Sequence, residues 1–159
     1  MEEFKLYNVE ARFPYLTHPY RPRYGLPKYT CSFYVKPGSR NMSLITNAIH
    51  NAAETEWPYT YEDKLQQAKL GPYGYPIVYA DRNKDPKSNG RVLVKSSAPF
   101  SNPPRLLDKH GNPSTEGFTD GSVLDVKLQV MATLPDALKS SPDVWSPIIR
   151  LIITEAQTV

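Results

Sequence analysis

Basic and aromatic residues occur together in the first third of the chain, in a segment without any acidic residue. Residues 11–53 include no Asp or Glu and carry a formal charge of +6. Cations neutralise phosphates and release their counterions, and aromatic faces stack on unpaired bases. The cations are Arg12, Arg21, Arg23, Lys28, Lys36 and Arg40, and the aromatic residues among the early cations are Phe13, Tyr15, Tyr20, Tyr24, Tyr29, Phe33 and Tyr34. This pattern indicates a surface for single-stranded nucleic acid, although a basic loop whose tyrosines pack on the domain fits it equally.

Side chains of the kinds used in catalysis are present but scattered. One cysteine cannot supply a cysteine-rich metal cage, and the histidines are far apart in sequence. These residues are Cys31, His18, His50 and His110. The sequence has no Gly-x-Ser-x-Gly motif for a nucleophilic serine. We therefore expect no enzyme activity, no cofactor and no metal site. The enzymatic alternative is a magnesium-dependent nuclease that uses carboxylate ligands. Its candidate ligands are Asp81, Asp108 and Asp120.

The composition is that of an ordinary globular domain. A chain of 159 residues with 40% hydrophobic residues is expected to fold as one domain over residues 1–159. Residues 11–53 and 81–115 carry +6 and +4, whereas residues 116–159 carry −3, and this uneven charge attracts polyanions. No apolar run approaches the roughly 20 residues that span a bilayer, and the charged start differs from a secretory signal. We expect a cytoplasmic protein without a membrane partner.

Hydrophobic periodicity predicts a mainly β fold with one or two short helices. Strands are expected at residues 29–36, 77–79, 91–96, 122–133 and 148–154, where apolar residues alternate or run together. Helical spacing predicts a helix over residues 42–53, capped by Asn41 or Ser43 and stopped before Pro58, and a second over residues 61–69. Strands interrupted by an early helical insertion favour an OB-fold-like five-stranded Greek-key barrel.

Two alternating strands predict which side chains reach the surface. Their inward positions are Cys31, Phe33, Val35, Val92 and Val94. Their outward positions include Tyr34, Lys36, Arg91 and Lys95. Because successive side chains of a strand point to opposite faces, an aromatic ring and several cations are expected to share one exposed sheet face.

Residues 11–28 are interpreted as a basic aromatic N-terminal arm. Four prolines, at positions 14, 19, 22 and 27, stiffen this segment in an extended form. A stiff arm loses less conformational entropy when it docks on a nucleic acid strand. The alternative left open is an N-terminal segment that wraps around the domain and closes the barrel.

The order of these features resembles the phage single-stranded DNA-binding proteins of the T7 type and their relatives. An alternating strand at 28–36 is followed by a helix, as in that family. The other similar segments are PIVYADR at 76–82, GRVLVKSS at 90–97, PPRLLDKHGNP at 103–113, and DGSVLDV at 120–126 followed by the strand at 148–154. The resemblance covers roughly residues 10–155 and implies an OB-fold.

The resemblance also implies which residues contact DNA. The groove cations would be Arg91, Lys95 and Arg105. The aromatic residues that stack on bases would be among Tyr29, Phe33, Tyr34 and Tyr79, and strand alternation favours Tyr34 while it assigns Phe33 to the core. With Lys36 from the same face, the predicted DNA-binding residues are Tyr29, Tyr34, Lys36, Tyr79, Arg91, Lys95 and Arg105.

The function implied is sequence-independent coating of single-stranded DNA in phage replication or recombination, in the cytoplasm of the infected bacterial host cell. Replication or recombination proteins, and a second copy in a homodimer, are left open as further partners. T7-type proteins end in an acidic tail that recruits the polymerase and other replication proteins, whereas residues 153–159 contain one acid; an absent tail and a tail that lies beyond these residues are both left open. The other function class is a protein-interaction or structural adaptor module that uses the proline-rich basic arm.

Overall fold

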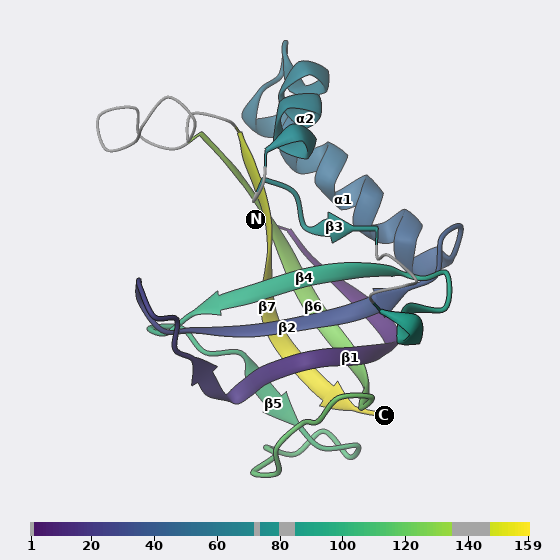
Figure 1. Ribbon diagram of the computed structural model, residues 1–159, viewed down its shortest axis with the longest axis vertical. Coiled ribbons are helices and arrows are strands. Elements are labelled where there is room, and N and C mark those ends of the chain that lie inside the picture. The colour runs from purple at the N-terminus through teal and green to yellow at the C-terminus, as the bar shows by residue number, and fades with distance from the viewer. Residues whose placement is uncertain (1, 72–73, 80–84, 135–146) are drawn as a thin grey trace.

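Five long strands and two helices make up most of the computed structural model, which describes residues 2–71, 74–79, 85–134 and 147–159 (Figure 1). The long strands are β1 (Glu3–Tyr20), β2 (Lys28–Val35), β4 (Val92–Pro99), β6 (Val123–Thr133) and β7 (Ile148–Thr158). The shorter strands are β3 (Ile77–Val78) and β5 (Arg105–Leu107), and the helices are α1 (Arg40–Glu56) and α2 (Tyr61–Leu70). A 3-10 turn, η1 (Pro86–Ser88), precedes β4.

The long strands form a closed barrel in the order β4-β2-β1-β6-β7. Neighbours in this order pair antiparallel, and a parallel pairing of Ser97 with Ile152 joins β4 to β7 and closes the barrel. In Figure 1, β4, β2 and β1 lie in front, and β6 and β7 cross behind them. The predicted OB-fold-like five-stranded barrel is confirmed.

Strand alternation builds the core. The inward positions of β2 and β4 are buried as predicted, and β6 buries every second residue from Leu124 to Val130. Leu6, Phe33, Val94 and Leu128 are fully buried where the strands meet. Burial of a side chain of this size contributes about 1.5–3 kcal/mol, so the barrel interior is the main source of stability.

Both predicted helices are present, and each begins near the expected residue. The N-cap of α1 is Ser39 rather than Asn41 or Ser43, and its hydroxyl accepts from the N–H of Met42. Asn41 instead bonds both backbone groups of Tyr7, which ties the start of the helix to β1. The helix ends before Pro58, and Gly71 ends α2. Figure 1 shows both helices at one end of the barrel.

The prediction of a separate arm over residues 11–28 is wrong. Residues 11–20 belong to β1, which pairs with β2 on one side and β6 on the other, and residues 21–27 connect β1 to β2. The alternative, a segment that belongs to the barrel, is nearer to the structure, because β1 is a barrel strand between β2 and β6, while β4 and β7 make the closure. Register shifts on both sides of this strand, and positive φ angles at Asn8 and Phe13, disrupt the alternation that would have identified it in the sequence.

Candidate nucleic-acid interface

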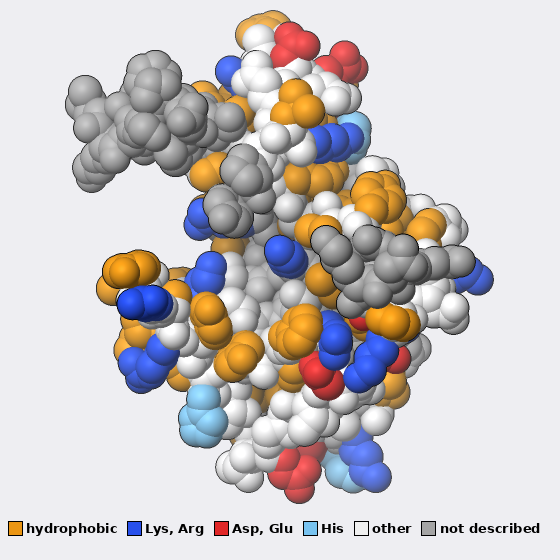
Figure 2. Space-filling view, viewed as in Figure 1, with side chains coloured by type: hydrophobic (Ala, Val, Ile, Leu, Met, Phe, Trp, Pro, Cys, Tyr) orange, Lys and Arg blue, Asp and Glu red, His pale blue; other side chains and the backbone are white. Residues whose placement is uncertain are grey.

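The outer face of the barrel, defined as the side chains of β1, β2, β4 and the adjoining start of β7 that point away from the core, carries two of the seven predicted residues, Tyr34 and Lys95. Strand register sets them in rows. Ser32 lies between Arg12 and Lys95 in one row, and Thr30 lies between Tyr15 and Ser97 in the next. The middle positions, Ser32 and Thr30, carry short polar side chains, which project little from the sheet. Figure 2 shows a white strip, which is neither hydrophobic nor charged, with hydrophobic and cationic side chains around it.

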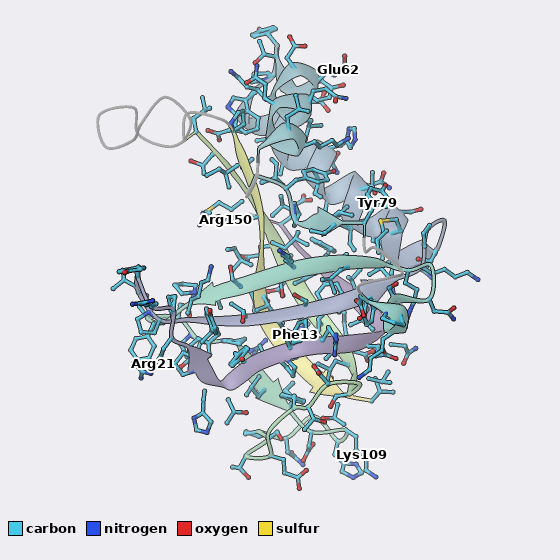
Figure 3. All side chains as sticks on the ribbon, viewed as in Figure 1. Phe13, Arg21, Glu62, Tyr79, Lys109 and Arg150 are labelled. Carbon is cyan, nitrogen blue, oxygen red and sulfur yellow. The ribbon has the colours of Figure 1, made fainter. Side chains whose placement is uncertain are left out.

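One corner of this face, the open corner, presents two exposed cations, Lys95 and Arg150. The parallel pairing of Ser97 with Ile152 brings Lys95 of β4 and Arg150 of β7 to equivalent positions two residues earlier on each strand. Both side chains are exposed, and no carboxylate in the described part of the chain lies within 4.0 Å of either. Figure 3 shows Arg150 above β4. Two cations at the barrel seam can bind adjacent phosphates.

Aromatic rings border the same face. The ring of Phe13 is 53% exposed, lies at the centre of the view in Figure 3, and has the Arg12 guanidinium 4.2 Å from its centroid. Its φ of 52° is unusual for a non-glycine residue, and Asp120 accepts its backbone N–H. Tyr15 and Tyr20 form an edge-to-face pair with centroids 5.2 Å apart. These rings belong to the acid-free segment, but the predicted DNA-binding set omitted them.

The predicted exposure of Tyr34 is wrong. Its side chain points away from the core cluster, as alternation predicts, but the residue is only 3% exposed. Its hydroxyl donates to Asp85 Oδ2 at 2.6 Å, and the Arg91 guanidinium lies 4.5 Å from the ring centroid. Burial, followed by the hydrogen bond and negative charge of Asp85, raises the pKa of Tyr34 to about 12. The ring is covered by residues that follow it in sequence by more than fifty positions.

We call the region of Arg12, Tyr34 and Arg91 the closed corner, because acids from other segments neutralise its two arginines. Arg91 pairs with Glu10 at 3.2 Å and also donates to the backbone carbonyls of residues 87 and 88. Arg12 pairs with Asp120 at 2.9 Å and lies 4.0 Å from Asp85. A segment free of acids in the sequence is therefore not free of acids in space, and these two arginines have less charge to offer a phosphate.

Two further predicted residues lie in structural contacts. Arg105 pairs with Glu155 at 2.8 Å, and the buried carboxylate of Glu155 also receives Lys127 at 3.4 Å. Because a buried charge must be compensated, Arg105 stabilises the contact between β5 and β7. Tyr29 occupies an inward position, is half-buried against the core, and stacks on Phe100 at a centroid distance of 6.2 Å.

The remaining predicted residues are exposed. Lys36 directly follows β2, and Tyr79, which is 84% exposed, follows the short strand β3. Val78 pairs with Leu93, so Tyr79 extends from the side of β4 that faces away from β2. It lines a pocket of about 630 Å³ beside the start of α1. The structure thus places Tyr79 beside the rows of the outer face and not within them (Figure 3).

Catalytic groups do not gather in the residues that the structure describes. No three His, Cys, Asp or Glu side chains there lie close enough to hold a metal ion. Of the nuclease candidates, Asp108 accepts the backbone N–H groups of His110 and Asn112 in a turn, Asp120 pairs with Arg12, and Asp81 lies outside the described residues. Cys31 is buried, and burial raises its pKa to about 12.

No described helix has the length and apolar character needed to cross a membrane.

Comparison with known proteins finds similarity to solved structures. No protein-family model matches the chain. No curated protein matches it either. The single-stranded DNA-binding protein from bacteriophage Enc34, solved in complex with single-stranded DNA, superposes with a TM-score of 0.75 over 99% of this chain and 85% of that protein, at 14% identity. The T7 single-stranded DNA-binding protein gp2.5 gives a TM-score of 0.65 over 99% and 86%, also at 14% identity. The chain therefore shares their fold.

Proposed function

We propose that this chain binds single-stranded DNA across the outer face of its barrel, without preference for sequence. The observation that supports this most directly is the open corner, where Lys95 and Arg150 are both exposed near the pairing of β4 with β7 and have no carboxylate partners among the described residues. Phosphates would bind these cations. Bases would stack on the rings that border the face, Phe13 and Tyr15 first. The exposed cations of the β1–β2 connection, Arg21 and Arg23, would extend the path beyond the sheet.

The chemistry of the face favours a single strand over a duplex. Exposed rings stack on bases only when those bases are unpaired, and every base offers a π-face, so stacking is tolerant of sequence. The middle of the face offers short hydroxyl side chains, Thr30, Ser32 and Ser97, and not the long amides or guanidinium forks that read base edges. Affinity would come from phosphate and ring contacts that any sequence can make.

The shared fold supports the biological setting that we propose. One structural neighbour is a phage protein solved with single-stranded DNA bound, and another is encoded by bacteriophage T7. We propose that this chain acts in phage DNA replication or recombination in the cytoplasm of an infected bacterium, with replication or recombination proteins as further partners. Binding requires no chemical step on the DNA. Because one chain forms the whole outer face, each copy in a homodimer would carry its own binding face, and a homodimer is compatible with this role.

Titration of a labelled thymidine oligomer tests the proposal. The oligomer has about 25 nucleotides, enough for at least one OB-fold site, and fluorescence anisotropy is recorded at two salt concentrations beside a duplex of equal length. We expect tight binding of the single strand, weak binding of the duplex, and a logarithmic loss of affinity of about 0.7 per phosphate contacted as salt rises. Absence of binding at low salt would refute the proposal. A protein-adaptor role would then be preferred, and its binding would depend little on salt.

A further inference from the structure

The carboxylate of Asp85 lies beside Arg12, at the end of the row that runs from Lys95 through Ser32 to Arg12 on the outer face. Asp85 Oδ2 accepts the Tyr34 hydroxyl at 2.6 Å, while Asp85 Oδ1 lies 4.0 Å from Arg12 Nη2. Neither Arg12 Nε nor Asp85 Oδ1, both buried, has a hydrogen-bond partner among the described residues. Buried polar atoms without partners are costly, so this contact between Asp85 and Arg12 is incomplete.

The unpaired edge of Arg12 has the geometry of an anion site. Nη1 is used by Asp120 at 2.9 Å, which leaves Nε and Nη2 as a pair of parallel donors on one edge of the guanidinium. Two parallel N–H groups of arginine match two oxygens of a carboxylate or a phosphate. Asp85 approaches this edge with only one oxygen and at a long distance. An anion with more oxygens can satisfy both donors and the Tyr34 hydroxyl together.

Strand register connects this place to the open corner. Lys95, Ser32 and Arg12 form one row across β4, β2 and β1. Neighbouring strands lie about 4.8 Å apart, so Arg12 is about two strand spacings, roughly 10 Å, from Lys95. A nucleic acid backbone bound at Lys95 and directed along the row passes over the short side chain of Ser32 and arrives at Arg12.

We propose that Arg12 and the Tyr34 hydroxyl form a second phosphate subsite, and that Asp85 fills it in the unbound protein and yields to a backbone phosphate of single-stranded DNA. This inference rests on the proposed function. No covalent step is involved, because one anionic acceptor replaces another on the same donors. Asp85 lowers the affinity of the closed corner for DNA, and in the unbound protein it accepts the Tyr34 hydroxyl and places a negative charge near the Arg12 guanidinium.

Replacement of the carboxylate by its amide tests the subsite. Asp85→Asn keeps the shape and still accepts from Tyr34, but it removes the negative charge. We expect the affinity for the 25-nucleotide thymidine oligomer to rise by about fivefold at low salt, because one more phosphate contact forms without competition. The slope of log affinity against log salt should steepen by about 0.7. Asp85→Ser serves the same purpose if the amide variant does not fold.

A matched variant separates this effect from a general change of charge. Glu62→Gln also removes one negative charge, and Figure 3 shows Glu62 at the end of the helical region, away from Phe13 and the outer face. This variant should leave the salt slope unchanged. Arg12→Gln and Arg12→Lys both remove the pair of parallel donors. In either background, Asp85→Asn should no longer raise affinity beyond the Glu62→Gln control.

Each failure has its own signature. If the unmodified protein does not bind the oligomer at low salt, the proposed function is refuted and this inference with it. If the unmodified protein binds but Asp85→Asn behaves like Glu62→Gln, only the phosphate subsite is refuted. The subsite is refuted as well if Asp85→Asn raises affinity equally when residue 12 is glutamine, because the gain then does not pass through the guanidinium.

Discussion

The open and closed corners of the outer face carry the same kinds of side chain and differ in what surrounds them. At the open corner, Lys95 and Arg150 lie without ion pairs to the residues that the structure describes. At the closed corner, Arg12 and Arg91 are held by acids, and the Tyr34 ring beneath them is covered. The difference shows that availability for binding depends on neighbours in space, since residue type alone would rank the two corners equally.

The acids of the closed corner arrive from three separate segments. Glu10 comes from β1 itself, Asp85 from the residues before η1, and Asp120 from the turn before β6. The open corner lies instead beside the pairing of β4 with β7, where the carbonyls of Pro76 and Gly74 accept the backbone N–H groups of Lys95 and Ile149. If this contrast governs function, substitutions at the open corner should reduce DNA binding most, and substitution of Arg105, whose partner Glu155 is buried, should reduce stability instead.

The largest effect is expected from Lys95→Ala combined with Arg150→Ala. Each charged contact is worth about 1.5 kcal/mol or more, so the affinity for the thymidine oligomer should fall by about 3 kcal/mol, and the salt slope should flatten by about 1.4. Anisotropy titration at several salt concentrations measures both. Lys109→Ala is the control, since this exposed lysine lies on the loop below β5 (Figure 3). A double variant that binds like this control would show that the open corner is not the phosphate site.

Arg105→Ala should affect stability more than binding. Removal of this guanidinium leaves the buried Glu155 carboxylate with Lys127 alone, and because Arg105 is largely exposed we expect a loss of about 2 kcal/mol in the free energy of unfolding. Urea denaturation measures this loss, while affinity for the oligomer should stay within about twofold. A large loss of affinity with unchanged stability would restore the sequence-based role of Arg105 as a groove cation.

The sequence predicted the strands and helices that a local hydrophobic pattern specifies. Alternation predicted β2, β4 and β6 and their buried positions, and helical spacing predicted both helices. The closed corner could not be predicted in this way, because the Arg12–Asp120 pair spans 108 residues and the Tyr34–Asp85 hydrogen bond spans 51. Tyr34 was correctly placed on the outward side of its strand, yet alternation cannot show that another segment covers it. β1 was missed because its bulges shift the period of two that identifies a strand.

Phe13→Ala should weaken binding by a smaller amount than loss of the two cations. A stacked base contributes about 1–3 kcal/mol, and a single exposed ring at the edge of the face is expected near 1.5 kcal/mol. Stability should change little, because more than half of the ring is exposed. Tyr59→Ala is the matched control, since this tyrosine is 97% exposed beside α2 and away from the rows. Equal affinities for the two variants would exclude Phe13 as a base-stacking residue.

Tyr34→Phe tests the hydrogen bond between the Tyr34 hydroxyl and Asp85 in the closed corner, and we expect the smallest effect from it. The lost hydrogen bond to Asp85 should lower the free energy of unfolding by about 1 kcal/mol at neutral pH. The pKa of Tyr34 is raised to about 12 from an ordinary value of 10, so its stabilising contribution is complete below pH 10 and is lost as pH rises towards 12. The stability difference between the two proteins should therefore shrink over that window. Cys31 also titrates there, but both proteins contain it, so the difference isolates Tyr34. A difference that stays constant from pH 9 to 12 would contradict the hydrogen bond between the Tyr34 hydroxyl and Asp85, on which the proposed subsite rests.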